Sequence, residues 1–194
     1  MFKFLNLNPE IFGIDINDLS LKIVKLQKKP LGFDVVSFNE VAIKPGIVKE
    51  GAIVDQDALA KIITLACSTV RGAKLDTKYV VVSVPKEKSF SQLIQMPKMA
   101  TEDLASAVPY EIENYIPLTI DKVYLDFQVI DQHKKDSDHL DLLVNVMPKP
   151  IVDAYVACFK KAELTPCVLE VESQAIVRAL TKKGEKIPST IFID

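Results

Sequence analysis

The chain has 194 residues, of which 48% are hydrophobic and 26% are charged, enough to bury the core of one large domain or two small ones. Its 24 basic and 26 acidic side chains nearly cancel, so the overall charge would attract neither nucleic acid nor an anionic membrane surface. The three cysteines form no CxxC pair, and no apolar run approaches the roughly 20 residues that span a bilayer, so we expect a cytoplasmic protein with reduced thiols and no inserted segment.

The first part of the chain has a pattern that predicts three antiparallel strands, a helix and a fourth strand. The strand segments are FGIDI at 12–16, SLKIVKLQ at 20–27, FDVVSFNEVAI at 33–43 and YVVVSVP at 79–85. Asp55 can cap the helix, which ends near Gly72. Its apolar face consists of Leu59, Ile62, Ile63, Ala66 and Val70. Because YVVVSVP is apolar almost throughout, we expect this strand to be covered on both faces.

A second unit has a different order, with a strand and a helix followed by a hairpin. The strands are SFSQLIQMP at 89–97, VYLDFQVID at 123–131 and LDLLVNVMP at 140–148. The helix begins at Thr101, is expected to kink or divide at Pro109, and is closed by Pro117. Its apolar side carries Leu104, Val108, Ile112 and Tyr115. The polar hairpin loop holds His133 and His139, for which we expect solvation, because a metal site needs a fixed geometry.

The last part returns to alternating helix and strand. The segments are a helix PIVDAYVACFKKAEL at 150–164, a strand CVLEVE at 167–172, a helix SQAIVRALTKKG at 173–184 ended by Gly184, and a strand STIFID at 189–194. The order predicts one α/β unit with a mixed sheet, from residues 1–85 and 150–194. Residues 86–149 are predicted to form a separate, inserted α+β module.

The segment GIDINDLSLK, residues 13–22, resembles the phosphate 1 motif of the actin-like ATPase superfamily. Its form is similar to the opening of the PilM family of type IV pilus assembly proteins, relatives of the cell-division protein FtsA. Later segments resemble the same family in the same order; they are MPKMATEDLASAVPYEIENYIPL, DFQVI, LLVNVMPKPIVDAYVACFKKAEL and PCVLEVESQAIVRAL. The resemblance implies an actin-like, ribonuclease H-like fold. Residues 1–85 and 150–194 would be subdomain 1A, and residues 86–149 the inserted subdomain 1C.

The resemblance also implies a site for ATP and Mg²⁺ at the first loop. In such a loop, backbone N–H groups and a small hydroxyl bind phosphate oxygens, an aspartate holds water around the metal, and a lysine neutralises charge. By resemblance, Asp15 would be the Mg²⁺-side carboxylate, Ser20 the hydroxyl and Lys22 the phosphate lysine. Asn17 and Asp18 stand where the family has glycine and Thr or Ser. Asparagine tolerates left-handed backbone angles, whereas a carboxylate facing phosphates repels them.

Two further acidic residues belong to the nucleotide site that the resemblance implies. Glu172, at the end of CVLEVE, lies where actin-like relatives place a polar residue near the nucleotide, and Asp194 matches the first aspartate of the second phosphate motif. The alternative for Glu172 is an acidic residue that stabilises the start of the next helix. The alternative for the first loop is an Asx-type hairpin turn with a solvated Lys22.

By resemblance, the function is that of a non-catalytic scaffold in type IV pilus assembly. Family members bind the short N-terminal tail of the inner-membrane protein PilN in the groove between subdomains 1A and 1C, so we expect a cytoplasmic protein peripheral to the inner membrane. An extended tail could add to an exposed strand edge there. The altered loop favours a vestigial or half nucleotide site with at most very weak ATPase activity. Ring or filament assembly stays open, and the alternatives are an FtsA-like cell-division filament protein and an actin-superfamily ATPase or sugar kinase.

Overall fold

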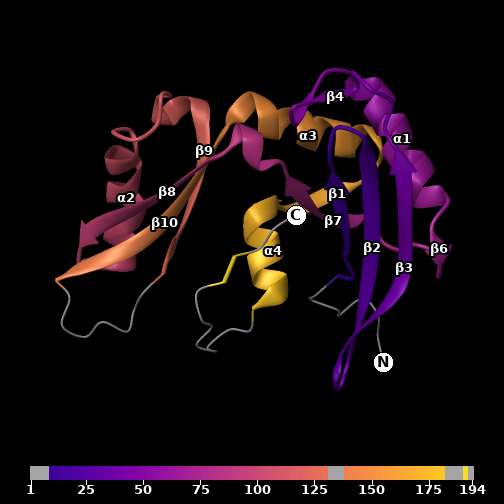
Figure 1. The fold of residues 1–194 in the computed structure, drawn as a ribbon, viewed down its shortest axis with the longest axis horizontal. Helices are drawn as coiled ribbons and strands as arrows, with labels where there is room; N and C mark the ends of the chain where they lie inside the picture. Colours follow the sequence, from indigo (N-terminus) through magenta and orange to yellow (C-terminus); the bar gives the residue numbers. More distant parts are fainter. Residues whose placement is uncertain (1–8, 131–137, 182–189, 192–194) are drawn as a thin grey trace.

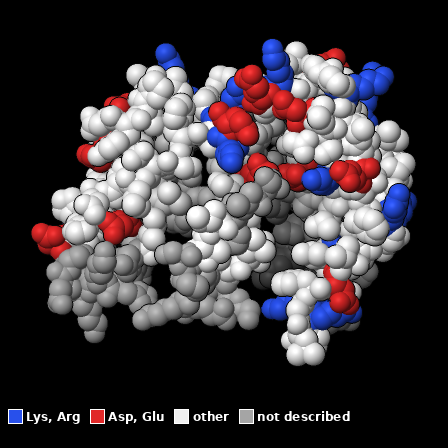
Figure 2. Space-filling view, in the orientation of Figure 1, with Lys and Arg blue, Asp and Glu red and all other residues white. Residues whose placement is uncertain are grey.

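The computed structural model describes residues 9–130, 138–181 and 190–191. These residues form two lobes, each built around its own sheet and its own apolar core (Figure 1). The space-filling view is hollowed between the small lobe and the rest of the molecule, and its charged side chains are of mixed sign (Figure 2). The structure is therefore an α/β fold with a mixed sheet and a separate α+β lobe, as the sequence predicts.

The large lobe is built on a six-stranded sheet with the order β11-β7-β1-β2-β3-β6. Its strands are β1 (Phe12–Ile16), β2 (Ser20–Lys29), β3 (Gly32–Ala42), β6 (Arg71–Gly72), β7 (Tyr79–Val84) and β11 (Thr165–Val171). The first three strands pair antiparallel, as predicted, whereas β7 pairs parallel with β1 and β11 parallel with β7. A small hairpin of β4 (Val48–Lys49) and β5 (Ala52–Ile53) follows β3.

Two helices cover one face of this sheet. They are α1 (Gln56–Ser68) and α3 (Lys149–Lys161). Asp55 caps α1 as predicted, because its carboxylate accepts a 2.9 Å hydrogen bond from the backbone N–H of Ala58. The helix ends at Ser68, so Val70 and Gly72 lie beyond it, and Gly72 belongs to β6. The core between the helices and the sheet contains the large, fully buried side chains of Phe12, Ile14, Leu21, Leu59, Ile63, Tyr155 and Phe159.

The opposite face of the large sheet is only partly covered. Along β7, Val80, Val82 and Val84 are buried, whereas the alternate residues are half-buried. The prediction that β7 is covered on both faces therefore holds in full for one face and only in part for the other. Part of that face lines a pocket beside α4 (Glu172–Leu180), the helix that lies between the two lobes (Figure 1).

The small lobe is a three-stranded sheet covered on one face by a helix. Its elements are β8 (Phe90–Pro97), α2 (Thr101–Ile112), β9 (Val123–Val129) and β10 (His139–Pro148), with the sheet order β8-β10-β9. α2 buries Leu104, Val108 and Ile112 against the sheet. It runs through Pro109 as one helix, so of the two predicted outcomes, a kink or a division, the division does not occur. Tyr115 lies after the helix end and is half-exposed, not on the packed side.

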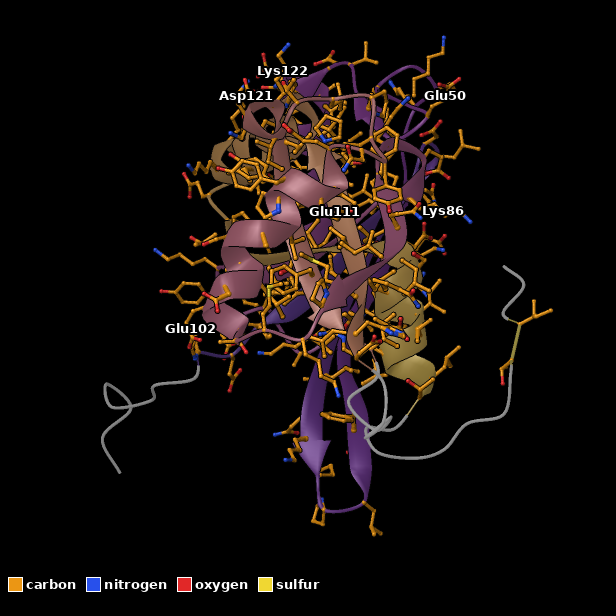
Figure 3. All side chains as sticks on the ribbon, turned by 90° about the vertical axis from the view of Figure 1, so that its left-hand side faces the viewer. Glu50, Lys86, Glu102, Glu111, Asp121 and Lys122 are labelled. Carbon is orange, nitrogen blue, oxygen red and sulfur yellow. The ribbon has the colours of Figure 1, made fainter. Side chains whose placement is uncertain are left out.

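Two connections join the lobes. The first passes through Pro85 and the short 3-10 helix η2 (Lys86–Lys88), and the second runs from β10 directly into α3. A second 3-10 helix, η3 (Ile120–Lys122), precedes β9. Tyr124 of β9 donates a 3.0 Å hydrogen bond from its hydroxyl to Asp153 of α3, a direct contact between the lobes. Figure 3 shows Asp121 and Lys122 at the same end of the molecule as Glu50.

Some predicted features fall outside the described residues. These are Gly184 and most of the strand predicted at residues 189–194. The last helix itself ends at Leu180, before an extended Thr181, so its predicted continuation to Gly184 is wrong. No helix in the part of the chain that the structure describes is long and apolar enough to cross a membrane.

Candidate functional site

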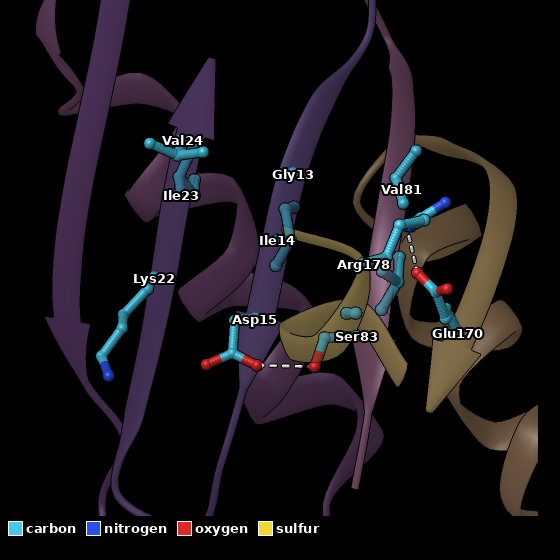
Figure 4. Close-up of a pocket in the computed structure, with 12 residues that line it drawn as sticks. Gly13, Ile14, Asp15, Lys22, Ile23, Val24, Val81, Ser83, Glu170 and Arg178 are labelled. Atoms are coloured by element: carbon cyan, nitrogen blue, oxygen red, sulfur yellow. Dashed lines mark hydrogen bonds and ion pairs between the residues drawn. The ribbon is translucent and has the colours of Figure 1, made fainter. Parts of the chain in front are cut away.

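A pocket of about 400 Å³ lies on the less covered face of the large sheet, beside α4 (Figure 4). Asp15 of β1 and Lys22 of β2 are directly opposite each other in the strand register, and both line this pocket. Asp15 accepts a 2.7 Å hydrogen bond from the hydroxyl of Ser83 on β7. The turn between β1 and β2 thus brings the predicted carboxylate and lysine to one surface, as a Mg²⁺–phosphate site would need.

The far wall of the pocket is closed by an ion pair between Glu170 of β11 and Arg178 of α4 (Figure 4). This pair fixes α4 against the sheet, and neither residue was predicted as part of a site. The alternation of CVLEVE places Glu170 on one face of its strand. No local signal links it to Arg178, because the two residues meet only when α4 folds back over β11.

The loop after β1 is capped by its own asparagine. Oδ1 of Asn17 accepts hydrogen bonds from the backbone N–H of Leu19 at 2.9 Å, the backbone N–H of Ser20 at 2.7 Å, and the hydroxyl of Ser20 at 3.3 Å. The backbone N–H of Asn17 donates in turn to the carbonyl of Ser20 at 3.0 Å. This is the Asx-type turn of the alternative interpretation. Asn17 does not have a positive φ, so left-handed tolerance is not why asparagine is accepted here.

Asp18 does not line the pocket, and its side chain binds a neighbouring turn. Its two carboxylate oxygens accept hydrogen bonds from the backbone N–H of Glu50 at 2.7 Å and of Gly51 at 3.0 Å. These residues form the tip of the β4–β5 hairpin, and both have positive φ, 49° at Glu50 and 73° at Gly51. An ionised carboxylate bound by two N–H groups makes strong, charge-assisted hydrogen bonds. The carboxylate is thus held by the protein's own backbone.

The same turn contacts the first connection between the lobes and the helix α3 that follows the second. A Cβ atom at Gly51 would lie 2.5 Å from Cγ of Pro85, so the turn packs closely against the first connection. The carbonyl of Gly51 accepts a 3.0 Å hydrogen bond from the hydroxyl of the buried Tyr155, on the helix that follows the second connection. Burial raises the pKa of Tyr155, and the negative charges of Asp18 and Asp15 add to the effect.

The remaining predicted site residues are dispersed. Glu172 is half-buried and is the first residue of α4, the position that favours an acidic side chain in the alternative interpretation. His139 is the first residue of β10 and not part of the loop; Gln95 and Asp138 lie within hydrogen-bond distance of its ring. Among the described residues no group of three or more His, Cys, Asp or Glu could hold a metal ion. Asp194 and His133 lie outside those residues.

The site fits a Mg²⁺–phosphate group only in part. Asp15 and Lys22 present a carboxylate and an ammonium to one pocket, which suits metal-bound phosphate. The loop does not fit, because the N–H groups of Leu19 and Ser20 and the Ser20 hydroxyl already donate to Asn17. A phosphate at this loop would have to displace a covalently attached acceptor.

Comparisons with known proteins agree with this fold. Residues 13–192 match the protein family described as Type IV pilus assembly protein PilM. A solved structure of a PilM-PilN type IV pilus biogenesis complex is similar to the chain, with a TM-score of 0.79 and 27% identity, covering 89% of this chain and 50% of that one. The cytoplasmic domain of EpsL, an inner membrane component of the type II secretion system of Vibrio cholerae, has a TM-score of 0.52 and 17% identity, covering 83% of this chain and 57% of that one.

The chain therefore spans between 50% and 57% of the length of these two solved chains. The likeness to the second structure concerns the fold alone. Together the matches confirm the predicted fold class, an actin-like mixed sheet with helices and an inserted small α+β module.

Proposed function

The chain belongs to the PilM family of type IV pilus assembly proteins, and on that basis we propose that it is a cytoplasmic scaffold that binds the N-terminal tail of a PilN-like inner-membrane protein. The observation that carries the proposal is the likeness to a structure of a PilM-PilN complex over most of this chain. The proposed location, peripheral to the inner membrane, follows from such a partner.

The proposed docking surface is the side of the small lobe that is turned toward α4. α2 covers one face of the small sheet, so the residues that alternate with its core face the hollow between the lobes (Figures 1 and 2). On that face lie Leu93, which is 55% exposed, and the half-buried Leu143, with polar neighbours around them. Ser91 donates to Asn145 at 2.7 Å and Gln95 to Asp141 at 2.9 Å. Apolar positions among fixed polar groups suit an amphipathic segment.

An exposed strand edge supports the binding of an extended tail. Among the residues that the structure describes, β11 is an edge strand of the large sheet and pairs with β7 only. In Figure 1 the strands β1, β2, β3 and β6 lie progressively farther from the small lobe. The sheet order puts β11 at the opposite edge, beyond β7, and therefore on the side of the small lobe. Its outer edge can accept main-chain hydrogen bonds from an added strand, while side chains of the small sheet supply specificity.

The proposal includes no catalytic role. Hydrolysis of ATP would require bound phosphates at the first loop, and the loop's donors are occupied by Asn17. The pocket with Asp15 and Lys22 favours a second candidate, an actin-superfamily ATPase in which these two residues hold Mg²⁺ and phosphate. The hydrogen bonds from the loop to its own Asn17 disfavour this second candidate, and we therefore propose that the nucleotide site is vestigial.

The test is a paired substitution with a tail peptide from a PilN-like protein. Leu93→Ser lies on the proposed surface, and Leu65→Ser lies on α1, on the far side of the large lobe (Figure 1). The two leucines are matched, being 55% and 52% exposed. We expect Leu93→Ser to weaken binding by about tenfold, the value of one lost buried side chain, and Leu65→Ser to leave it unchanged. Equal effects, or a peptide that binds neither variant nor wild type, would reject the proposal.

A further inference from the structure

We propose that Asn17 and Asp18 close the first loop with the protein's own oxygen atoms, so that the loop is inaccessible to phosphate and is fastened, without nucleotide, to the turn that packs against the first connection and α3. The proposal deepens the vestigial site of the proposed function and, in its consequence for the partner, rests on that function. Two observations carry it independently, the contacts of Asn17 inside the loop and the contacts of Asp18 outside it.

The first observation is that Asn17 occupies the place of an anion. Three donors that point to one centre, two backbone N–H groups and a hydroxyl, form the kind of concave site that binds an anion. Here they converge on a single atom, Oδ1 of Asn17, at 2.7 to 3.3 Å. Because this oxygen is attached to the loop itself, it competes with a dissolved phosphate at a very high effective concentration. In the wild-type protein we therefore expect phosphate not to bind to these three donors.

The second observation is that Asp18 ties the loop to a turn 32 and 33 residues away in the sequence. That turn, Glu50–Gly51, touches Pro85 at the first connection and Tyr155 after the second. Lys88, in η2 of the first connection, also lies 3.4 Å from the carboxylate of Glu50. Asp18 is thus a positioning residue, because it acts on the junction of the lobes through the turn.

The consequence is that the first loop, where a nucleotide would bind, is uncoupled from the hollow between the lobes, where the partner tail is proposed to bind. A ligand shifts a conformational equilibrium only by its differential affinity for the two states. If Asn17 excludes phosphate and Asp18 already holds the turn, ATP cannot change the arrangement of the two lobes around the hollow between them. Binding of a partner tail is then independent of nucleotide.

The test of Asn17 follows the amide NMR signals of Leu19 and Ser20 while sodium pyrophosphate or Mg-ATP is added to the 194-residue chain. Because Asn17 does not have a positive φ, alanine can adopt its backbone conformation, so Asn17→Ala removes the Oδ1 acceptor without backbone strain, and Asn17→Gly is a second variant. We expect no change at these two signals in wild type, and at least about tenfold tighter pyrophosphate binding in the variants. Asn114→Gly, in the small lobe next to the carbonyl of Glu111, is the matched control and should behave as wild type.

A gain of anion binding cannot arise from loss of stability, so the outcome distinguishes an occupied site from a merely structural asparagine. Shifts of the Leu19 and Ser20 signals in wild type, or variants that bind pyrophosphate no better than wild type, would overturn the proposal. The result does not depend on any tail peptide, so a failure of the proposed partner binding is distinguishable from a failure here.

The test of Asp18 is hydrogen exchange at the amides that it holds. In Asp18→Ala we expect the amides of Glu50 and Gly51 to exchange at least about tenfold faster, because each loses its acceptor. Asp34→Ala, an exposed aspartate of the β2–β3 hairpin whose nearest lysine is 3.9 Å away, is the control. Unchanged exchange at Glu50 and Gly51 would show that Asp18 does not fasten the turn.

Discussion

The hydroxyl of Tyr155 on α3 donates a 3.0 Å hydrogen bond to the carbonyl of Gly51, 104 residues earlier in the chain. The contact is buried, so removing the hydroxyl leaves a buried carbonyl without this partner. We expect Tyr155→Phe to lower the free energy of unfolding by about 1 to 3 kcal/mol, and Tm by roughly 2 to 4 °C for each kcal/mol in a chain of this size. Urea and thermal denaturation measure both.

The matched control is Tyr110→Phe, since Tyr110 is 77% exposed on α2. This substitution should change the free energy of unfolding by less than about 0.5 kcal/mol. Equal losses in the two variants would show that the Tyr155–Gly51 contact contributes nothing specific.

The close approach of Gly51 to Pro85 gives a second prediction. A Cβ at Gly51 would meet Pro85 at 2.5 Å, and the residue also has a φ of 73°. Gly46 has a φ of 92° but open space around it. We expect Gly46→Ala to cost about 1 to 2 kcal/mol for the backbone conformation alone, and Gly51→Ala to cost a further 1 to 3 kcal/mol from overpacking. Urea denaturation of both variants isolates the steric part, and a Gly51→Ala variant as stable as Gly46→Ala would contradict the packing.

Stability should fall in alkaline solution because several buried groups resist ionisation. Burial raises the pKa of Cys67 and of Cys158 from 9.0 to about 11, and raises the pKa of Tyr155 above its ordinary value of 10.0. Above about pH 9 the unfolded chain loses these protons first, so it binds fewer protons than the native state, and stability falls as pH rises.

The thiol contribution is lost between about pH 9 and pH 11, and the tyrosine adds to the fall above pH 10. Urea denaturation at a series of pH values measures it. Replacing Cys67 by alanine should make the fall shallower over the thiol range, and a slope identical to that of wild type would contradict burial as the cause.

Much of the fold follows from local sequence patterns. The three-strand meander and the cap at Asp55 are each specified by residues close together in the chain, and the structure has them where the sequence predicts them. The sequence predicts the end of this helix near Gly72, four residues later than the observed end at Ser68. The reason is that Val70 continues the apolar spacing although it is no longer helical. The partial cover of the second face of β7 could not be predicted, because an apolar run does not tell how much of each face its neighbours cover.

The candidate site could be predicted only in part. The register of β1 and β2 brings Asp15 and Lys22 together, as the motif requires, and asparagine at position 17 already allowed an Asx-type turn. The direction of Asp18 could not be predicted, since its partners at Glu50 and Gly51 belong to a hairpin that meets the loop only in the folded chain. The Glu170–Arg178 pair was missed for the same reason.

We propose that this PilM-family chain binds a PilN-like tail through a scaffold that needs no nucleotide. The most direct measurement is calorimetric titration of the tail peptide into the 194-residue chain, once without nucleotide and once with a large molar excess of Mg-ATP. We predict binding in both titrations, with Kd values that agree within about twofold, a difference of less than about 0.5 kcal/mol. Binding that appears only with Mg-ATP, or no binding in either titration, would contradict it.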